Sequence, residues 1–255
     1  MKRAPAADLD QGLTRLRLPT IRRLYSELFE EAEKDGWTHR EVLEQLVSEE
    51  IAHRAETKIT RSTRKAKFPY LKTIEEFDFQ FQSSVKRTML GRFLGPELIE
   101  TGRNLVLLGE PGRGKTHLAV AIAFKAIQNG YESRFVTAAQ LLNDMHAALR
   151  EGTAIEKLAE FVQPDVLVID ELGYLNYGAD AANSLFQVID QRYLAQKAVI
   201  ITTNKEPDDW GPVLHDSDLA DAIVDRLQER GEVIRLKGKS YRRRGAEPPP
   251  PPAAN

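Results

Sequence analysis

The chain has 255 residues, of which 42% are hydrophobic and 29% are charged, and its formal net charge is −2. This length and balance are ordinary for one or two globular domains. Cysteine is absent, which excludes disulfides, thiolate metal sites and cysteine nucleophiles. No apolar run approaches the roughly 20 residues of a membrane span, and the first ten residues do not form a secretory signal. We therefore expect a cytoplasmic protein without a membrane partner or a structural metal.

The small net charge hides two basic segments. Residues 54–67 contain six basic side chains and one acid, and residues 235–244 contain six basic side chains and no acid. Two basic patches on an otherwise acidic chain indicate local contacts with a polyanion. The alternative is that the first segment is only the water-exposed face of a helix, and charge alone does not decide between the two.

The N-terminal part of the chain is predicted to be helical. Residues 9–55 show helical periodicity, with Pro19 interrupting it, and Thr38 and Glu41 form a capping-box pattern that starts another helix. This helix continues into the first basic segment, where basic residues recur every three or four positions and share one helical face. Residues 1–67 are therefore predicted to form a small all-helical domain, ended by Phe68 and Pro69.

From residue 104 onward, short apolar runs alternate with helical segments. The runs are Asn104–Leu108, Arg134–Thr137, Asp165–Asp170, Ala198–Thr203 and Glu232–Leu236. Helices are predicted near residues 115–129, 138–150, 153–162, 179–196 and 216–230. This alternation predicts an α/β domain, residues 68–245, with a central parallel sheet and helices on both faces. The Pro-rich tail, residues 246–255, is expected to be disordered.

A phosphate-binding motif, G-x-x-x-x-G-K-[ST], lies between the first predicted strand and the helix after it. Its glycines let backbone N–H groups turn toward phosphates, and the helix N-terminus adds positive potential. Lys115 is expected to reach the β- and γ-phosphates of ATP, and the Thr116 hydroxyl to bind Mg²⁺. The predicted nucleotide-binding residues are Gly109, Glu110, Pro111, Gly112, Arg113, Gly114, Lys115, Thr116 and His117.

Polar residues end the third and fourth predicted strands. Asp170 is expected to hold Mg²⁺, and Glu171 to orient or deprotonate an attacking water. Asn204 follows the fourth strand, and its amide can hold that water without titrating. An acidic pair can also simply end a strand in water, and an Asn before Pro207 can simply form a turn. The phosphate loop upstream favours the functional interpretations.

The order of these elements resembles that of the AAA+ ATPases. Asp221–Leu227 is similar to the segment that carries an arginine finger in the initiator and helicase-loader branch of that class. The resemblance implies that Arg226 reaches the nucleotide of a neighbouring subunit, so that catalysis requires a homo-oligomer. The alternative is a surface arginine in an ion pair.

More narrowly, the chain resembles the IstB family, the ATPase helpers of insertion-sequence transposition, which are related to the helicase loader DnaC. The similar segments include Gly114–Ala119, Ile169–Tyr174 and Gly238–Arg242. The resemblance implies Mg²⁺-dependent ATP hydrolysis, assembly on duplex DNA with little sequence preference, and delivery of that DNA to an IstA-like transposase. It also implies that no C-terminal lid follows the ATPase domain, which makes Ser240–Arg242 a candidate substitute for a lid arginine.

This resemblance gives the first basic segment a DNA-binding role, because Lys and Arg contacts to phosphates do not read bases. The candidate DNA-binding residues are Arg54, Lys58, Arg61, Arg64 and Lys65. Two other functions stay open. One is a DnaC-like helicase loader, whose output would be a protein–protein contact. The other is a P-loop kinase, against which the context of Arg226 and the lack of a substrate lid argue.

Overall fold

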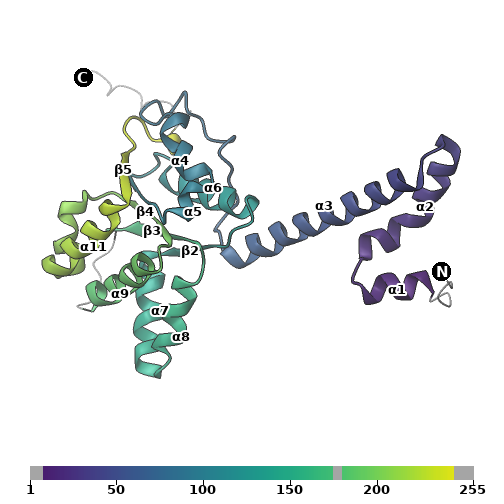
Figure 1. Ribbon diagram of the computed structural model, residues 1–255. Coiled ribbons are helices and arrows are strands. Elements are labelled where there is room, and N and C mark those ends of the chain that lie inside the picture. The colour runs from purple at the N-terminus through teal and green to yellow at the C-terminus, as the bar shows by residue number, and fades with distance from the viewer. Residues whose placement is uncertain (1–7, 175–179, 244–255) are drawn as a thin grey trace, which may run out of the picture. The chain divides into compact units, whose positions relative to one another are not determined.

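The computed structural model describes residues 8–174 and 180–243 (Figure 1). The chain forms two compact units, Met1–Arg61 and Ser62–Asn255. The division falls within one long helix, whereas the sequence places its boundary after residue 67. The predicted disordered tail lies outside the described residues. Within the described part of the chain, no helix is long and apolar enough to cross a membrane.

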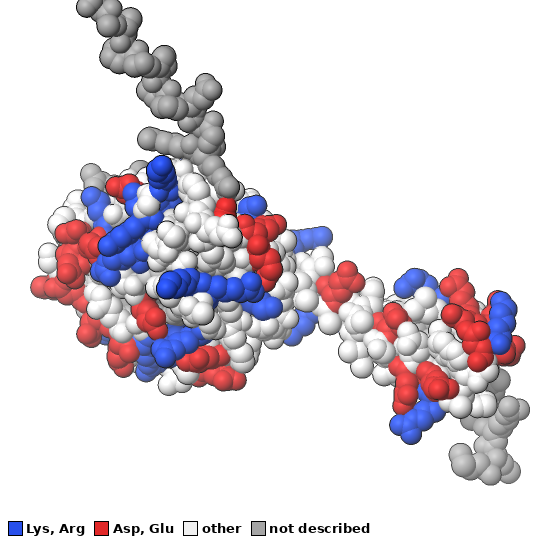
Figure 2. Space-filling model, turned by 90° about the horizontal axis from the view of Figure 1, so that it is seen from above, with Lys and Arg blue, Asp and Glu red and all other residues white. Residues whose placement is uncertain are grey.

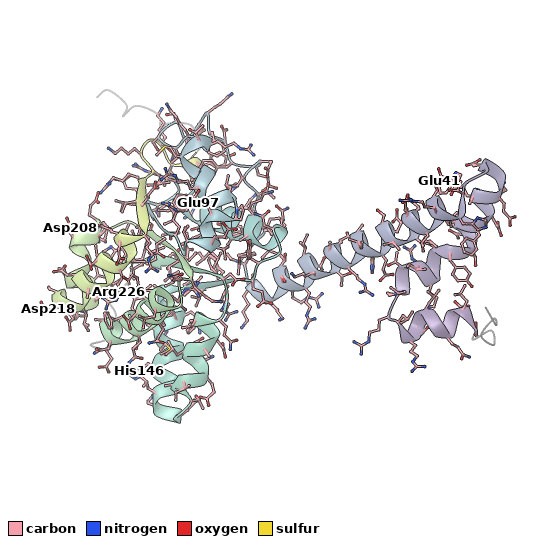
Figure 3. All side chains as sticks on the ribbon, viewed as in Figure 1. Glu41, Glu97, His146, Asp208, Asp218 and Arg226 are labelled. Carbon is pink, nitrogen blue, oxygen red and sulfur yellow. The ribbon has the colours of Figure 1, made fainter. Side chains whose placement is uncertain are left out.

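The first unit contains helices α1 (Leu9–Arg15), α2 (Pro19–Asp35) and most of α3 (His39–Ala66). The predicted capping box at the start of α3 is present, since the Glu41 N–H donates to Thr38 Oγ1 (3.3 Å) and the Thr38 N–H donates to Glu41 Oε2 (2.7 Å). Figure 3 labels Glu41 at this end of the helix. The continuation of α3 through the basic segment is also confirmed.

One buried carboxylate fastens α3 to the start of α2. Glu50 is 4% exposed and accepts the backbone N–H groups of Thr20 (2.9 Å) and Ile21 (3.1 Å) and the Nε–H of Arg54 (2.8 Å). Burial raises the pKa of the Glu50 carboxyl, but these hydrogen bonds outweigh it and hold the pKa below its ordinary value. An anion at a helix N-terminus is stabilising, so this contact fixes the fold of the helical unit.

The second unit is built on a five-stranded parallel sheet in the order β2-β3-β4-β1-β5. The strands are β1 (Asn104–Leu108), β2 (Ser133–Thr137), β3 (Val166–Leu172), β4 (Ala198–Thr203) and β5 (Gly231–Arg235). The predicted α/β fold is therefore confirmed, and the predicted ends of β1 and β4 agree with the structure.

Helices cover both faces of this sheet (Figure 1). The helices of this unit after α3 are η1 (Arg87–Leu90), α4 (Gly91–Leu94), α5 (Glu97–Glu100), α6 (Lys115–Gln128), α7 (Ala138–Glu151), α8 (Ala154–Val162), α9 (Ala181–Leu194), η2 (Pro207–Asp209), α10 (Trp210–Leu214), α11 (Ser217–Glu229) and η3 (Tyr241–Arg243). The short helices among them were not predicted from the sequence, namely η1, α4, α5, η2, α10 and η3.

Two hydrophobic cores lie on opposite faces of the sheet because successive strand residues point to opposite sides. In β1, Leu105 and Leu107 belong to the core that contains α6. Val106, between them, belongs to the core formed with α7, α9 and α11. The carboxyl ends of the parallel strands thus meet at one edge of a sheet that is buried on both faces. The predicted nucleotide-site residues lie there, after β1, in the last residues of β3 and after β4.

Candidate nucleotide site

The loop between β1 and α6 has the shape of a phosphate cradle. Gly112 and Gly114 have φ angles of 79° and 90°, in the left-handed region that favours glycine. A Cβ on Gly112 would lie 2.1 Å from Ser240 Oγ, and one on Gly114 would lie 2.7 Å from the Phe77 ring. Both positions therefore require glycine. The loop leads into the N-terminus of α6, where unpaired N–H groups favour an anion.

Lys115, the first residue of α6, is 6% exposed. Its ammonium donates to the backbone carbonyls of Gly109 (2.6 Å) and Glu110 (3.0 Å) and to the Tyr174 hydroxyl (3.0 Å). Because these acceptors are uncharged, burial dominates and lowers the pKa of Lys115 to about 8, despite the nearby Asp170. A phosphate would be a stronger acceptor than any of the three.

Thr116 and Asp170 offer oxygen ligands side by side. The Thr116 hydroxyl oxygen lies 3.0 and 3.2 Å from the two carboxylate oxygens of Asp170, which is 4% exposed. The Thr202 hydroxyl also donates to this carboxylate. A hydroxyl and a carboxylate next to a phosphate cradle fit Mg²⁺, which takes its remaining ligands from water and phosphate.

Glu171 reaches the pocket because β3 is irregular at this point. The register between β3 and β4 shifts between Ile169 and Leu172, and Glu171 has a φ of 62°. Its backbone N–H donates to the Thr202 hydroxyl (3.0 Å). The bulge gives the two adjacent carboxylates different environments, with Asp170 buried and Glu171 exposed to the pocket. The first environment suits a metal ligand, and the second suits a group that handles water.

Asn204, just after β4, is placed differently. Its Oδ1 is buried and has no hydrogen-bond partner among the residues that the structure describes. The same oxygen lies 3.5 Å from the position that a Cβ on Gly173 would take. The side chain does not line the pocket. A buried amide oxygen without a donor is uncommon, and a water molecule is the smallest donor that could satisfy it.

The phosphate loop, Lys115, Thr116 and Glu171 border a pocket of about 340 Å³, within the usual size range of ligand sites, whereas Asp170 lies outside the lining and contacts it through Thr116. Predicted residues in its lining are Pro111, Gly112, Arg113, Gly114, Lys115, Thr116, His117 and Glu171. Gly109 and Glu110 do not line it but supply carbonyl groups to Lys115. The His117 Nε2 atom lies 3.0 Å from the Thr73 carbonyl oxygen, and burial lowers the pKa of His117.

Three tyrosines that the sequence analysis did not assign also line this pocket. They are Tyr70, Tyr174 and Tyr241. Burial, followed by the charge of Asp170, raises the pKa of Tyr70. Tyr174 contacts Lys115, and burial raises its pKa as well. The sequence signal for Tyr174 was its place three residues after Glu171.

Arg226, labelled in Figure 3, lies between α11 and α9 and does not line the pocket of its own chain. Its Nε donates to Asp190 Oδ1 (2.9 Å), and one terminal nitrogen donates to the Ala222 carbonyl (3.1 Å). The guanidinium carbon lies 4.7 Å from the centre of the Phe186 ring and 5.9 Å from that of Tyr193. Within one chain, Arg226 thus forms the ion pair that the sequence analysis gave as the alternative.

The basic residues of α3 are exposed but not equivalent. Arg54 pairs with Glu50 and also donates to the Arg17 carbonyl, so it stabilises the helical unit. The Lys65 Nζ atom lies 3.8 Å from Glu132 Oε1. The other predicted DNA contacts on this helix are Lys58, Arg61 and Arg64, all exposed. Figure 2 shows acidic and basic side chains interspersed on the visible surface.

Comparison with known proteins places these features in a family. The model of the family described as IstB-like ATP binding protein matches residues 11–247. A protein named as an ATP-binding protein of insertion sequence IS5376, from Geobacillus stearothermophilus, is 40% identical over 230 residues, covering 90% of this chain and 91% of that protein. A protein named for the same property in insertion sequence IS21, from Pseudomonas aeruginosa, is 33% identical and covers 92% and 88%.

Solved structures agree with this assignment. A DnaC helicase loader is 26% identical, with a TM-score of 0.51, and the match covers 69% of this chain and 99% of that one. AMPPCP-bound DnaA from Aquifex aeolicus shares the fold, with 23% identity, a TM-score of 0.53 and coverage of 67% and 51%. The predicted AAA+ fold is thereby confirmed. The chain belongs to the IstB-like family of insertion-sequence ATP-binding proteins.

Proposed function

We propose that this protein hydrolyses ATP, assembles on duplex target DNA and delivers that DNA to the transposase of its insertion sequence. The observation that carries the proposal is a pocket lined by Lys115, Thr116 and Glu171, with Asp170 behind the lining and hydrogen-bonded to Thr116. Family membership supports ATP binding and the insertion-sequence context. Hydrolysis, duplex DNA, the homo-oligomer and the transposase are the proposed additions.

Different residues at the pocket bind the phosphates, hold the metal ion and position the attacking water in this proposal. The loop N–H groups and Lys115 bind the phosphates of ATP, and Thr116 and Asp170 hold Mg²⁺. Mg²⁺, when bound, neutralises phosphate charge. Glu171 orients or deprotonates the attacking water. Asn204, whose buried Oδ1 lies outside the pocket lining, is proposed to accept a hydrogen bond from that water.

Arg226 completes the site of a neighbouring copy in this proposal. It does not line its own pocket, as a residue that acts on another subunit requires. Its pairing with Asp190 would open or reorient on assembly. Turnover would therefore depend on oligomer formation. Mixing an Arg226→Ala chain with a Lys115→Ala chain should restore part of the activity that each lacks alone, and no recovery would contradict the role in trans.

Glu171→Gln tests hydrolysis directly. The amide keeps the size of the side chain but cannot accept a proton, so turnover should fall about a hundredfold or more while ATP binding is kept. ATPase rate, ATP affinity and oligomer size are measured with and without duplex DNA. Glu156→Gln, on the exposed surface of α8, is the matched control and should behave as the wild type. Near-normal turnover of Glu171→Gln would place the base elsewhere.

Binding to duplex DNA is assigned to the exposed basic residues of α3. Each lost phosphate contact lowers the slope of log affinity against log salt by about 0.9, so Arg61→Ala with Arg64→Ala should flatten it by about two units on any duplex. The control pair, Arg23→Ala with Arg40→Ala, removes equal charge outside the basic segment. An unchanged slope in the first pair would mean that this face of α3 is only water-exposed surface.

A helicase loader is the second candidate, favoured by the match to nearly the full length of a DnaC chain. A loader would bind a replicative helicase ring through its N-terminal helices. Failure of the wild-type protein to bind duplex DNA, together with stable binding to such a ring, would favour this alternative. A transposase gene next to the gene for this protein would favour the first.

A further inference from the structure

Helix α3 contains a stretch, residues 55–61, in which no side chain is buried. On its N-terminal side, Arg54 fastens α3 to the helical unit by pairing with Glu50 and donating to the Arg17 carbonyl. On its C-terminal side, the next buried side chain is that of Ser62, which is 8% exposed. The boundary between the two compact units falls at the end of this stretch. About two helical turns therefore lie between the parts of α3 that tertiary packing stabilises.

A helical stretch without packing depends on the intrinsic helix propensity of its residues. Three of them, Thr57, Ile59 and Thr60, are β-branched, and such side chains lose rotamer freedom in a helix. Thr and Ile accordingly rank below Ala, Leu, Lys and Glu as helix formers. The local sequence thus favours the helix only weakly.

The charges around this stretch weaken the helix further. Arg61 is followed by Arg64 and Lys65, three and four positions on, and like charges at these spacings destabilise a helix. Glu56 is the single acid of residues 54–67, and no Lys or Arg lies three or four positions from it. A polyanion along the basic face would remove the repulsion, because its phosphates neutralise the basic side chains.

We propose that residues 55–61 form a conditional helix. In the free protein they exchange between helix and coil, and contact with DNA phosphates makes them stably helical. The inference rests on the proposed binding of duplex DNA to α3. Because α3 runs from the first unit into the second, DNA binding then stiffens the connection between the units. The free energy of ordering opposes binding, so the stability of this helix and the affinity for DNA are coupled.

Hydrogen exchange of the full-length protein tests the free state. The amides of residues 55–61 should exchange about tenfold faster or more than those of residues 42–50, which belong to the packed part of the same helix. Saturation with a DNA duplex of mixed sequence should slow the first group to the rate of the second. Equal protection of both groups without DNA would overturn the proposal. Protection without DNA that is lost on dilution would also overturn it, since a second copy of the chain would then hold the segment.

A second test changes helix propensity without changing charge. Ala55→Gly should weaken duplex binding about threefold to fivefold, because the binding-competent helix is then less populated in the free protein. Thr60→Ala should strengthen binding about twofold for the opposite reason. The slope of log affinity against log salt should stay that of the wild type in both, because no basic side chain is lost.

The matched control makes a similar change in the packed part of α3. Gln45→Gly lowers helix propensity at an exposed position, but packing holds the helix there, so the affinity for DNA should stay within about twofold of the wild type. If Ala55→Gly also binds DNA as tightly as the wild type does, residues 55–61 are a rigid helix without DNA and the proposal is wrong.

Failure of this inference is distinguishable from failure of the proposed DNA site. Arg61→Ala with Arg64→Ala tests the site itself. If that pair flattens the salt slope while Ala55→Gly has no effect, only the conditional helix is rejected. If the pair leaves the slope unchanged and Ala55→Gly has no effect, DNA is bound elsewhere and both proposals are rejected.

Discussion

Two cations are buried at opposite edges of the same sheet. Lys115 lies at the carboxyl end of β1, beside the pocket. Arg192, on α9, is fully buried near the amino ends of β3 and β4. Its two terminal nitrogens donate to the backbone carbonyls of Phe161, Val162, Pro164, Asp165 and Ala198. Both cations thus depend on neutral acceptors.

The hydrogen-bond acceptors of the two cations differ in whether a ligand could replace them. Burial lowers the pKa of Arg192 to about 9 and that of Lys115 to about 8, so the cost of burial acts on both. The acceptors of Arg192 are main-chain groups that end a helix and begin two strands, and no ligand can replace them. Those of Lys115 belong to a glycine-rich loop and to one side chain of the pocket. A buried cation therefore indicates a ligand site only where its partners can be exchanged.

The largest effect is expected from Arg192→Leu. Removing the guanidinium leaves buried carbonyls without donors, so the free energy of unfolding of the second unit should fall by about 3–5 kcal/mol. Urea unfolding is followed by the fluorescence of Trp210, which is buried in that unit, in a Trp37→Phe background. A loss below about 1 kcal/mol would mean that water replaces the guanidinium and that the two sites are alike.

Lys115→Ala should affect ATP binding strongly and stability little, which is the opposite of what stability shows for Arg192→Leu. ATP affinity should fall about a hundredfold, close to 3 kcal/mol, because the charge of the phosphates is left uncompensated. The free energy of unfolding should change by less than about 1 kcal/mol, because removing the ammonium also removes the cost of burying it. Calorimetric titration with ATP and urea unfolding give the two numbers. If Lys115→Ala strongly destabilised the protein and still bound ATP, Lys115 would be a structural cation like Arg192 and not a ligand-binding one.

Local sequence was enough to predict one of these cations and not the other. Lys115 belongs to a motif with fixed spacing, and the ends of β1 and β4 were predicted because apolar runs there are bounded by polar residues. Arg192 gave no signal, since a single arginine in a mostly apolar helix usually lies on its exposed edge. Its burial depends on strand ends that come together only in the folded sheet.

The rest of the pocket was missed for the same reason. Tyr70 and Tyr241 come from segments on either side of the sheet-forming region, and their approach to the loop depends on the path of the whole chain. The bulge at Glu171 could not be predicted from the sequence either. An Asp-Glu pair predicts two carboxylates at a strand end but not their separate environments. The ion pair of Arg226 with Asp190 joins two helices, and was foreseen only as an alternative.

The pH dependence of ATP binding gives a smaller effect that tests whether Lys115 exchanges its partners for phosphate. The pKa of Lys115 is lowered from 10.5 to about 8 in the folded protein, and contact with phosphate would raise it again. Binding then takes up a proton above pH 8, so ATP affinity should fall about fivefold between pH 8 and pH 9. Calorimetry at pH 8.5 in two buffers of different ionisation enthalpy measures the uptake. Lys115→Ala, with no ammonium to titrate, should show none of this dependence.

The same shift predicts the sign of a stability effect. Between pH 8 and pH 10.5 the unfolded chain holds the Lys115 proton more tightly than the folded chain does. The unfolded state therefore binds more protons, and the contribution of Lys115 to stability rises with pH across this window. Subtracting the free energies of unfolding of Lys115→Ala from those of the wild type at each pH gives the contribution of Lys115 to stability. A difference that falls with pH would contradict the lowered pKa.

The smallest effect concerns the exchangeable partner itself. Tyr174→Phe removes a hydroxyl that accepts a hydrogen bond from Lys115 (3.0 Å), a bond that the ammonium gives up if it turns to phosphate. The variant should bind ATP about threefold to fivefold more tightly at pH 7, because one competing contact of about 1 kcal/mol is gone from the free protein. Tyr131→Phe, which removes a hydroxyl outside the pocket lining, controls for the substitution. If Tyr174→Phe binds ATP more weakly, the hydroxyl stays on Lys115 or contacts the nucleotide in the complex. Tyr174 would then be a fixed ligand, as the carbonyls around Arg192 are, and exchange of partners would not explain why Lys115 lies at a site.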